Sequence, residues 1–298
     1  MGGRSAEHEV SLASGKEVVK NLNPKKYDIL PVVIKKDGKR WHIGKVDIVF
    51  IALHGPYGED GTIQGMLELA GLPYTGSKVL ASALGMSKIM SRKIWQNEKI
   101  RVNPFSVFKK GDKISKIFRK FSYPFVVKPS DQGSSVGVSI VHRKSELEKA
   151  LDLAFSYSKE IIVEKYIKGM EVQCGILGNE KPIALPLVEI VPKHEFFDYA
   201  CKYTPGLSEE IVPARVDRAT AQQIQKIAVA SYKALGCRGF ARVDMFLADD
   251  GKIYVSEINT IPGLTANSLL PKEAKVAGIS FPRLLDNIIN YALEKNLA

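Results

Sequence analysis

The most constraining feature of the sequence is an Asp250-Gly251 dipeptide between two apolar stretches within residues 240–265. An Asp-Gly pair tolerates the positive φ angles of a two-residue loop, so it predicts a β-hairpin. Such a loop fixes the partner of every residue in the two strands. Asp244 then lies opposite Glu257, and because side chains alternate between the faces of a strand, both acids share one face.

The same register sets Arg242 opposite Asn259, on the face that carries the two acids. Carboxylates directly across a ladder repel each other unless a cation compensates them. Mg²⁺ suits this role because it takes oxygen ligands from protein carboxylates and substrate phosphates. The alternative is a solvated face on which the acids flank Arg242 or Lys252. The opposite face is predicted to point into the core, with Val243, Met245, Leu247, Tyr254 and Ile258.

The chain of 298 residues has room for one large domain or for two to three smaller ones. No apolar run approaches the roughly 18 residues of a membrane span, and the N-terminus lacks the apolar segment of a signal peptide. The three cysteines form no CxxC pair, which indicates reduced thiols in a cytoplasmic protein. We therefore expect no membrane partner.

The net charge of +11 is compatible with binding nucleic acid or small acidic substrates such as nucleotides. The only dense basic cluster lies within residues 109–120 and lacks the aromatic interleaving of a stacking platform. We interpret it as a solvated basic face and expect no nucleic-acid partner.

Strands predicted over residues 27–34 and 46–53, with helices over 10–22 and 62–70, are typical of an α/β unit with a parallel sheet. Ligands bind beyond the carboxyl ends of such strands. One helix is predicted to run from about residue 77 past Arg92. The remaining predicted elements are strands over 125–128, 137–141, 161–164, 172–177 and 183–190, a helix over 145–157 with a capping box at Ser145 and Glu148, and a helix over 220–235.

Two further segments indicate a nucleotide, although each has a simpler alternative. The loop over residues 132–137 (QGSSVG) can wrap phosphate oxygens with its backbone N–H groups, and Lys128 supplies a positive charge beside it. A plain hairpin loop is the alternative. In residues 164–171 an extended backbone can bond an adenine edge while Glu171 accepts a ribose hydroxyl, and a surface loop is the alternative. The histidines show no zinc-site spacing.

Taken together and in this order, the motifs resemble the ATP-grasp superfamily and, within it, the D-alanine–D-alanine ligase family. The resemblance spans nearly the whole chain. It is carried by residues 2–11 (GGRSAEHEVS), 54–61 (HGPYGEDG), 74–77 (YTGS), 127–129 (VKP), 133–137 (GSSVG), Lys202-Tyr203, 242–244 (RVD), 257–260 (EINT) and 262–269 (PGLTANSL).

The resemblance implies an α/β and α+β fold of the ATP-grasp type. An N-terminal α/β domain with a parallel sheet is expected over residues 1–84. Two α+β subdomains that clamp ATP follow over 85–171 and 172–298, the second with the metal site and a mobile loop over 191–213. Family members carry an apolar strand before the Gly-Gly turn, whereas here Met1 directly precedes it, so we expect the first domain to lack that strand.

The resemblance also implies roles for individual residues. ATP is expected to contact Lys88, Lys128, Ser134, Ser135, Glu164, Lys165, Tyr166, Ile167, Glu171 and Asn259. Two Mg²⁺ or Mn²⁺ ions are expected on Asp244, Glu257 and Asn259. The first D-alanine is expected to be positioned by a trio of Glu7, Ser134 and Tyr203, with further substrate contacts from His54 and Lys202. Arg242 and the Gly263 N–H are expected to stabilise an oxyanion, and Ser268 and Leu269 to bind the second substrate's carboxylate.

The implied reaction is ATP-dependent ligation of two D-alanines through an acyl phosphate, for peptidoglycan synthesis, by a cytoplasmic homodimer. A D-alanine–D-lactate ligase is one alternative, although Tyr203 is the residue type expected for dipeptide formation. A non-catalytic ATP-binding module of the same superfamily is another. Its members are expected to lack one of Arg242, Asp244, Glu257 or Asn259, and all four are present.

Overall fold

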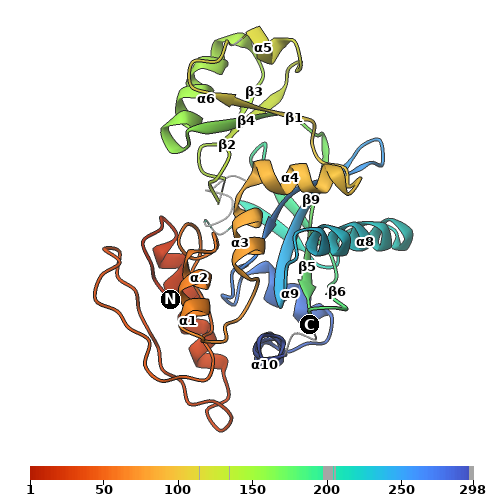
Figure 1. Ribbon diagram of the computed structural model, residues 1–298. Coiled ribbons are helices and arrows are strands. Elements are labelled where there is room, and N and C mark those ends of the chain that lie inside the picture. The colour runs from red at the N-terminus through yellow and green to blue at the C-terminus, as the bar shows by residue number, and fades with distance from the viewer. Residues whose placement is uncertain (114, 134, 197–203, 205, 295–298) are drawn as a thin grey trace.

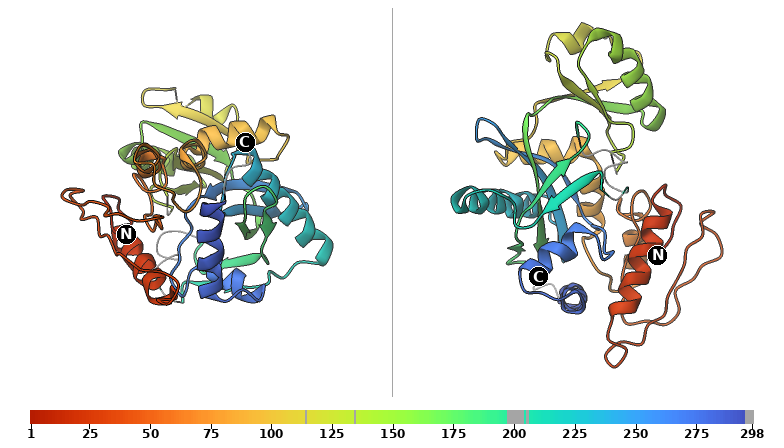
Figure 2. Two further views of the ribbon diagram at one scale, coloured as in Figure 1. Left: turned by 60° about the horizontal axis from the view of Figure 1, so that its bottom comes forward. Right: turned by 180° about the vertical axis from the view of Figure 1, so that it is seen from behind.

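The computed structural model describes residues 1–113, 115–133, 135–196, 204 and 206–294. Figure 1 shows an N-terminal part at lower left, a small sheet with two helices at the top, and a larger sheet with long helices at right. Seen from behind, the small sheet again stands apart from the N-terminal part (Figure 2). The mixed α/β and α+β architecture that the sequence predicts is confirmed. The domain boundaries at residues 84/85 and 171/172 stay predictions.

The N-terminal part contains helices α1 (His8–Asn21), α2 (Thr62–Leu69) and α3 (Val79–Met86). The predicted strands over residues 27–34 and 46–53 are reduced to isolated parallel bridges, Gly2 to Ile34 and Val49 to Tyr74. The parallel direction is therefore correct, but the predicted extent is wrong. Pro31 interrupts the first segment, because proline has no N–H to donate to a ladder.

One predicted helix is in fact two. The segment from residue 77 past Arg92 breaks at Ser87 into α3 and α4 (Lys88–Asn97). Ser87 has an extended backbone, and its Oγ accepts a hydrogen bond from the Met90 N–H as the cap of α4. The break makes Lys88 the first residue of a new helix, directed toward the centre of the molecule.

The small sheet is antiparallel with strand order β1-β4-β2-β3. Its strands are β1 (Phe105–Lys109), β2 (Phe125–Pro129), β3 (Ser139–Val141) and β4 (Glu160–Lys165), and its helices are α5 (Ser115–Phe118) and α6 (Lys144–Tyr157). The sheet and α6 enclose a core around Phe125 and Val163. The predicted capping box at Ser145 and Glu148 is wrong. Helix α6 begins one residue earlier, and the Glu146 carboxylate instead accepts from the His142 N–H.

The larger sheet is also antiparallel, with order β10-β9-β5-β7-β8 and with β6 on β5. Its strands are β5 (Gly169–Leu177), β6 (Ile183–Ala184), β7 (Val188–Pro192), β8 (Ser208–Ile211), β9 (Phe240–Ala248) and β10 (Ile253–Asn259). The predicted strand over residues 183–190 is divided by Pro186 into β6 and β7. Strand β8 lies within the segment predicted to be a loop over 191–213.

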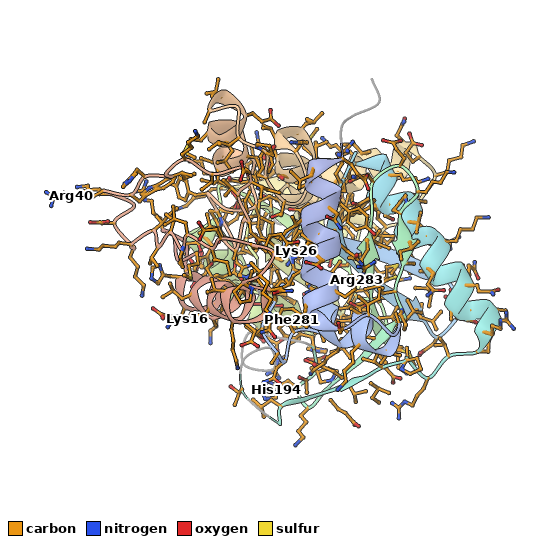
Figure 3. The ribbon with its side chains drawn as sticks, turned by 90° about the horizontal axis from the view of Figure 1, so that it is seen from below. Lys16, Lys26, Arg40, His194, Phe281 and Arg283 are labelled. Atoms are coloured by element: carbon orange, nitrogen blue, oxygen red, sulfur yellow. The ribbon has the colours of Figure 1, made fainter. Side chains whose placement is uncertain are left out.

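Helices cover the larger sheet and join it to the N-terminal part. They are α8 (Arg218–Ala234), α9 (Leu269–Val276) and α10 (Phe281–Leu293), and α8 packs on a core with β5, β9 and β10. Asp286 on α10 accepts a hydrogen bond from Tyr27 Oη at 2.7 Å and pairs with Lys26 at 3.1 Å. Figure 3 shows Lys26 beside α10. No helix of the described part is long and apolar enough to cross a membrane.

The hairpin of β9 and β10 has the predicted register at the acids but not at the turn. Asp244 pairs with Glu257 and Arg242 with Asn259, as expected. Nearer the turn, however, Leu247 pairs with Ile253 rather than with Tyr254, so the loop spans residues 249–251. The predicted two-residue loop is therefore wrong.

A β-bulge between Val255 and Glu257 restores the register. The extra residue, Ser256, reverses the facing of the residues that precede it. Tyr254 consequently leaves the predicted core face, and Ile253 and Val255 join the core in its place.

Gly251 closes the turn with a φ of +78°, a conformation that costs a residue with a Cβ about 1 kcal/mol. A Cβ at this position would meet no atom within 4 Å, so backbone strain alone sets the cost. We expect Gly251→Ala to lower the free energy of unfolding by about 1 kcal/mol in urea titrations. Asp249→Ala in the same loop is the control, expected within about 0.5 kcal/mol of wild type. Equal stability of the two variants would contradict the loop described here.

Candidate active site

Two clefts meet in the interior of the molecule. The first, of about 370 Å³, lies between the small sheet and the larger one. Residues predicted to contact ATP line it, namely Lys88, Lys128, Ser135, Glu164, Tyr166, Ile167 and Glu171, together with the predicted metal ligands Asp244 and Glu257. Lys165 is exposed at the end of β4 and is not among the lining residues.

The second cleft, of about 800 Å³, opens between the N-terminal part and the larger sheet. Most residues predicted to contact substrate line it, namely Glu7, His54, Arg242, Gly263, Ser268 and Leu269, and so does Asn259. Lys88 and Glu257 line both clefts. They form an ion pair of 3.1 Å between Nζ and Oε2, so the two clefts join at this pair.

The acids of the hairpin each have a cationic partner. Arg242 donates from Nε and Nη2 to the two carboxylate oxygens of Asp244, at 2.7 and 2.8 Å. Burial disfavours the charge of this guanidinium, but Asp244 outweighs burial and raises the pKa of Arg242 above its ordinary value. Among the described residues, these two bonds use two of the five N–H donors of the guanidinium. Arg242 also lines the second cleft, where donors not bonded to Asp244 can reach a ligand.

Lys88 connects the first cleft to the glycine-bearing loop of the small sheet. Its Nζ donates to the Gln132 carbonyl at 2.6 Å, and its backbone N–H donates to the Ser130 carbonyl at 3.1 Å. The side chain is largely buried. One lysine therefore contacts the loop, the acid Glu257 and both clefts.

Glu164 lies in a buried cluster that the sequence did not predict. Its Oε1 pairs with Lys128 Nζ at 2.9 Å, and its Oε2 accepts from Arg92 on α4. Although burial opposes ionisation, these two cations hold the pKa of Glu164 below its ordinary value. Burial lowers the pKa of Lys128 to about 8, with Arg92 adding to the effect.

Arg92 is the principal residue that sequence reasoning missed. It is completely buried, and its Nε and Nη2 also donate to the Ser256 carbonyl at 3.2 and 3.1 Å. The Ser256 carbonyl, at the bulge of the hairpin, thereby has a hydrogen-bond donor. The one signal in the sequence is its place four residues after Lys88, which puts both cations on one face of a helix.

Two glycines shape the second cleft. A Cβ on Gly55 would lie 2.6 Å from Glu7 Oε2, and a Cβ on Gly263 would lie 2.7 Å from Ser268 Oγ. Ser268 Oγ in turn accepts from the Thr265 N–H at 3.0 Å. The absence of side chains at 55 and 263 thus lets Glu7 and the start of α9 approach the cleft closely.

Ser134, Lys202 and Tyr203 lie outside the described residues. The predicted trio of Glu7, Ser134 and Tyr203 and the predicted contact of Lys202 with phosphate therefore stay predictions. The same holds for the mobile loop, since residues 197–203 and 205 within it are not described.

The hairpin acids fit a hard divalent cation by the chemistry of their donors. Asp244, Glu257 and Asn259 offer only oxygen, the ligand that Mg²⁺ prefers, and they lie within two ladder pairs that share a strand face. The Asn259 amide oxygen accepts from the Ile261 N–H at 2.9 Å, which fixes its orientation. Among the described residues, no group of three or more His, Cys, Asp or Glu could hold a metal ion by itself. Mg²⁺ usually takes only one or two protein carboxylates, with waters and substrate phosphates as its other ligands.

Comparison with known proteins decides the family. The model for the D-ala D-ala ligase N-terminus matches residues 1–45 and 42–77, and the model for the D-ala D-ala ligase C-terminus matches residues 94–290. The chain belongs to the D-alanine–D-alanine ligase family. The family predicted from the motifs is thereby confirmed.

Individual family members are similar over almost their whole length. A D-alanine–D-alanine ligase of Geotalea uraniireducens is 48% identical over 296 residues, covering 99% of this chain and 94% of that protein. The crystal structure of the VanG D-Ala:D-Ser ligase from Enterococcus faecalis has a TM-score of 0.89 at 38% identity, covering 98% and 97% of the two chains. The D-alanine–D-alanine ligase of Bacillus anthracis complexed with ATP has a TM-score of 0.82 at 38% identity, covering 98% and 95%.

The lowered pKa of Lys128 gives nucleotide affinity a pH dependence. The free protein loses this proton near pH 8, whereas bound phosphates favour the protonated ammonium. Binding above pH 8 therefore takes up a proton, and we expect the Kd for ATP to rise about fivefold between pH 8 and pH 9 in calorimetric titrations.

Lys128→Arg is the matched control, because a guanidinium keeps its charge throughout this range. Its Kd for ATP is expected to stay constant between pH 8 and pH 9. A wild-type Kd that is equally constant would show that Lys128 does not titrate against the nucleotide.

Proposed function

We propose that this protein is an ATP-dependent D-alanine–D-alanine ligase that forms D-alanyl-D-alanine, ADP and phosphate for peptidoglycan synthesis. The observation that carries the proposal is the junction of the two clefts at the Lys88–Glu257 pair. A nucleotide in the first cleft and a carboxylate in the second meet at this junction. The family relationship and the ATP-bound relative support ATP as the nucleotide.

The first step activates a carboxylate, which is by itself a poor electrophile. A carboxylate oxygen of the first D-alanine attacks the γ-phosphorus of ATP, the bond to the β-phosphate breaks, and ADP and an acyl phosphate result. Transfer of this kind depends mainly on positioning and charge neutralisation. Lys88 and Lys128 supply positive charge from α4 and β2, and Glu7 at the start of α1 faces the ammonium of the substrate.

Asp244, Glu257 and Asn259 are the residues that would hold two Mg²⁺ or Mn²⁺ ions. Bound there, the metal ions would neutralise charge on the nucleotide phosphates. Arg242 donates two hydrogen bonds to Asp244, and Lys88 forms an ion pair with Glu257. The two carboxylates thus each have a cationic partner beside the proposed metal site.

The second step forms the peptide bond. The uncharged amine of the second D-alanine attacks the acyl carbon, negative charge develops on the former carbonyl oxygen, and phosphate leaves as the amine loses a proton. Arg242 and the Gly263 N–H line the cleft at which this oxygen would lie. Ser268 and Leu269 begin α9, where backbone N–H groups and the helix dipole favour the second substrate's carboxylate.

Three further parts of the proposal concern the second substrate, assembly and location. None of the three relatives described above is named for D-lactate, whereas one is named for D-serine. The homodimer rests on the family resemblance alone, and a monomer in sedimentation equilibrium would contradict it. A cytoplasmic location stays part of the proposal, and cell fractionation tests it.

A coupled assay of ADP release tests the activity directly. We expect ADP formation to require D-alanine, and the dipeptide to appear in step with it. D-serine, D-lactate and L-alanine are then offered singly and together with D-alanine. Equal turnover with L-alanine alone would refute the assignment, and mixed products with D-serine would move it toward a D-alanine–D-serine ligase.

Arg242→Ala tests the oxyanion role. Loss of one donor to a developing oxyanion lowers kcat by about 10²- to 10³-fold, and we expect a loss of this size with the KM for ATP changed less than about threefold. Arg238→Ala is the control, because Arg238 precedes β9 and lines neither cleft. Unchanged turnover of Arg242→Ala would remove this residue from the mechanism.

A further inference from the structure

His54 lies in the second cleft, but both of its ring nitrogens are bound to protein atoms. Nδ1 lies 2.9 Å from the Ile261 carbonyl, and Nε2 lies 2.8 Å from Ser14 Oγ. The ring is buried, and burial lowers the pKa of His54 below its ordinary value. The imidazole is therefore neutral and carries a single N–H.

The partners decide which nitrogen carries that proton. A carbonyl only accepts, so Nδ1 must be the donor to Ile261. Nε2 is then the acceptor, and the Ser14 hydroxyl donates to it. Ser14 Oγ has lone pairs left, and one of them accepts the Leu264 N–H at 3.3 Å. Every donor and acceptor in this chain of hydrogen bonds is satisfied.

The hydrogen bonds from His54 to Ile261 and from Leu264 to Ser14 hold residues on either side of Gly263. Ile261 and Leu264 are both buried, and they are held by groups 207 and 250 residues earlier in the chain. Between them, Gly263 faces the second cleft. The N-terminal part thus fixes both ends of the turn that presents the Gly263 N–H.

We infer that Ser14 and His54 are positioning residues that hold the Gly263 N–H in place for the oxyanion of the peptide-forming step. The inference rests on the proposed function. It assigns His54 to the turn rather than to direct substrate contact, and it gives Ser14, a helix residue with no contact to substrate, an effect on the second step alone.

Kinetics of Ser14→Ala test the inference. We expect the kcat for dipeptide formation to fall about tenfold while the KM for ATP changes less than about twofold, because the first cleft is untouched. We also expect more than one ADP per dipeptide, since the acyl phosphate still forms but is lost to water. Ser14→Cys, which keeps the volume and a weak donor, is expected to lie between Ser14→Ala and wild type.

Ser231→Ala is the matched control. Ser231 is likewise a completely buried serine inside a helix, α8, and its Oγ donates to the Ile227 carbonyl at 2.8 Å. It lines neither cleft. We expect it to lower the Tm as much as Ser14→Ala does while retaining one ADP per dipeptide. Equal coupling ratios in the two variants would overturn the inference.

Two substitutions of His54 test its hydrogen bonds to Ile261 and to Ser14 separately. His54→Asn keeps an amide donor near the Nδ1 position, and His54→Gln keeps an amide near the Nε2 position instead. We expect both to raise the ratio of ADP to dipeptide, because each releases one end of the turn. A raised KM for D-alanine with an unchanged ratio would overturn the inference in favour of direct substrate binding.

A spectroscopic readout is independent of turnover. ¹⁵N NMR of the imidazole is expected to show the Nδ1–H tautomer in wild type and a shifted Nε2 resonance in Ser14→Ala. An Nε2–H tautomer in wild type would overturn the inference while leaving the proposed activity intact. Failure of wild type to form any dipeptide would instead refute the proposed function, and the inference with it.

Discussion

The structure depends on the neutralisation of one buried acid, Glu164, by Arg92 and Lys128. Removing Glu164 would leave the buried charges of Arg92 and Lys128 without this partner, and breaking a buried ion pair in this way costs about 3–5 kcal/mol. Arg92 also donates to the Ser256 carbonyl. A single guanidinium therefore joins α4, the small sheet and the hairpin of β9 and β10, and it fixes the two sides of the first cleft relative to each other.

The hairpin shows how a correct prediction can rest on a partly wrong derivation. The loop over residues 249–251 is one residue longer than the dipeptide predicts, and the bulge at Ser256 shifts the register back. The longer loop and the bulge each shift the register by one residue. The two shifts cancel at Asp244 and Glu257, but not at Tyr254, which lies between them. The Asp-Gly dipeptide predicts a turn, and the alternation of apolar and polar residues predicts strands. Neither predicts a bulge at Ser256, whose carbonyl accepts hydrogen bonds from Arg92 on α4.

Local signals predicted most elements of the two sheets, and failures occurred where a single residue overrides a pattern. Pro31 and Pro186 interrupt strands, and Ser87 caps a new helix inside an apolar run. Most of the site residues that the motifs predicted, where the structure describes them, do line the two clefts. The sequence did not predict the roles of Arg92 and Ser14, because their partners lie far away in the sequence and only the folded chain brings them together.

The position of Lys88 makes the two clefts thermodynamically dependent on each other. It is bonded to the loop over residues 130–132 on one side and to Glu257 on the other. A movement of the small sheet relative to the larger one would therefore act on an ion pair that both clefts share. A nucleotide that displaces Lys88 would thereby change the affinity of the second cleft for an amino acid, and linkage requires the factor to be identical in both directions.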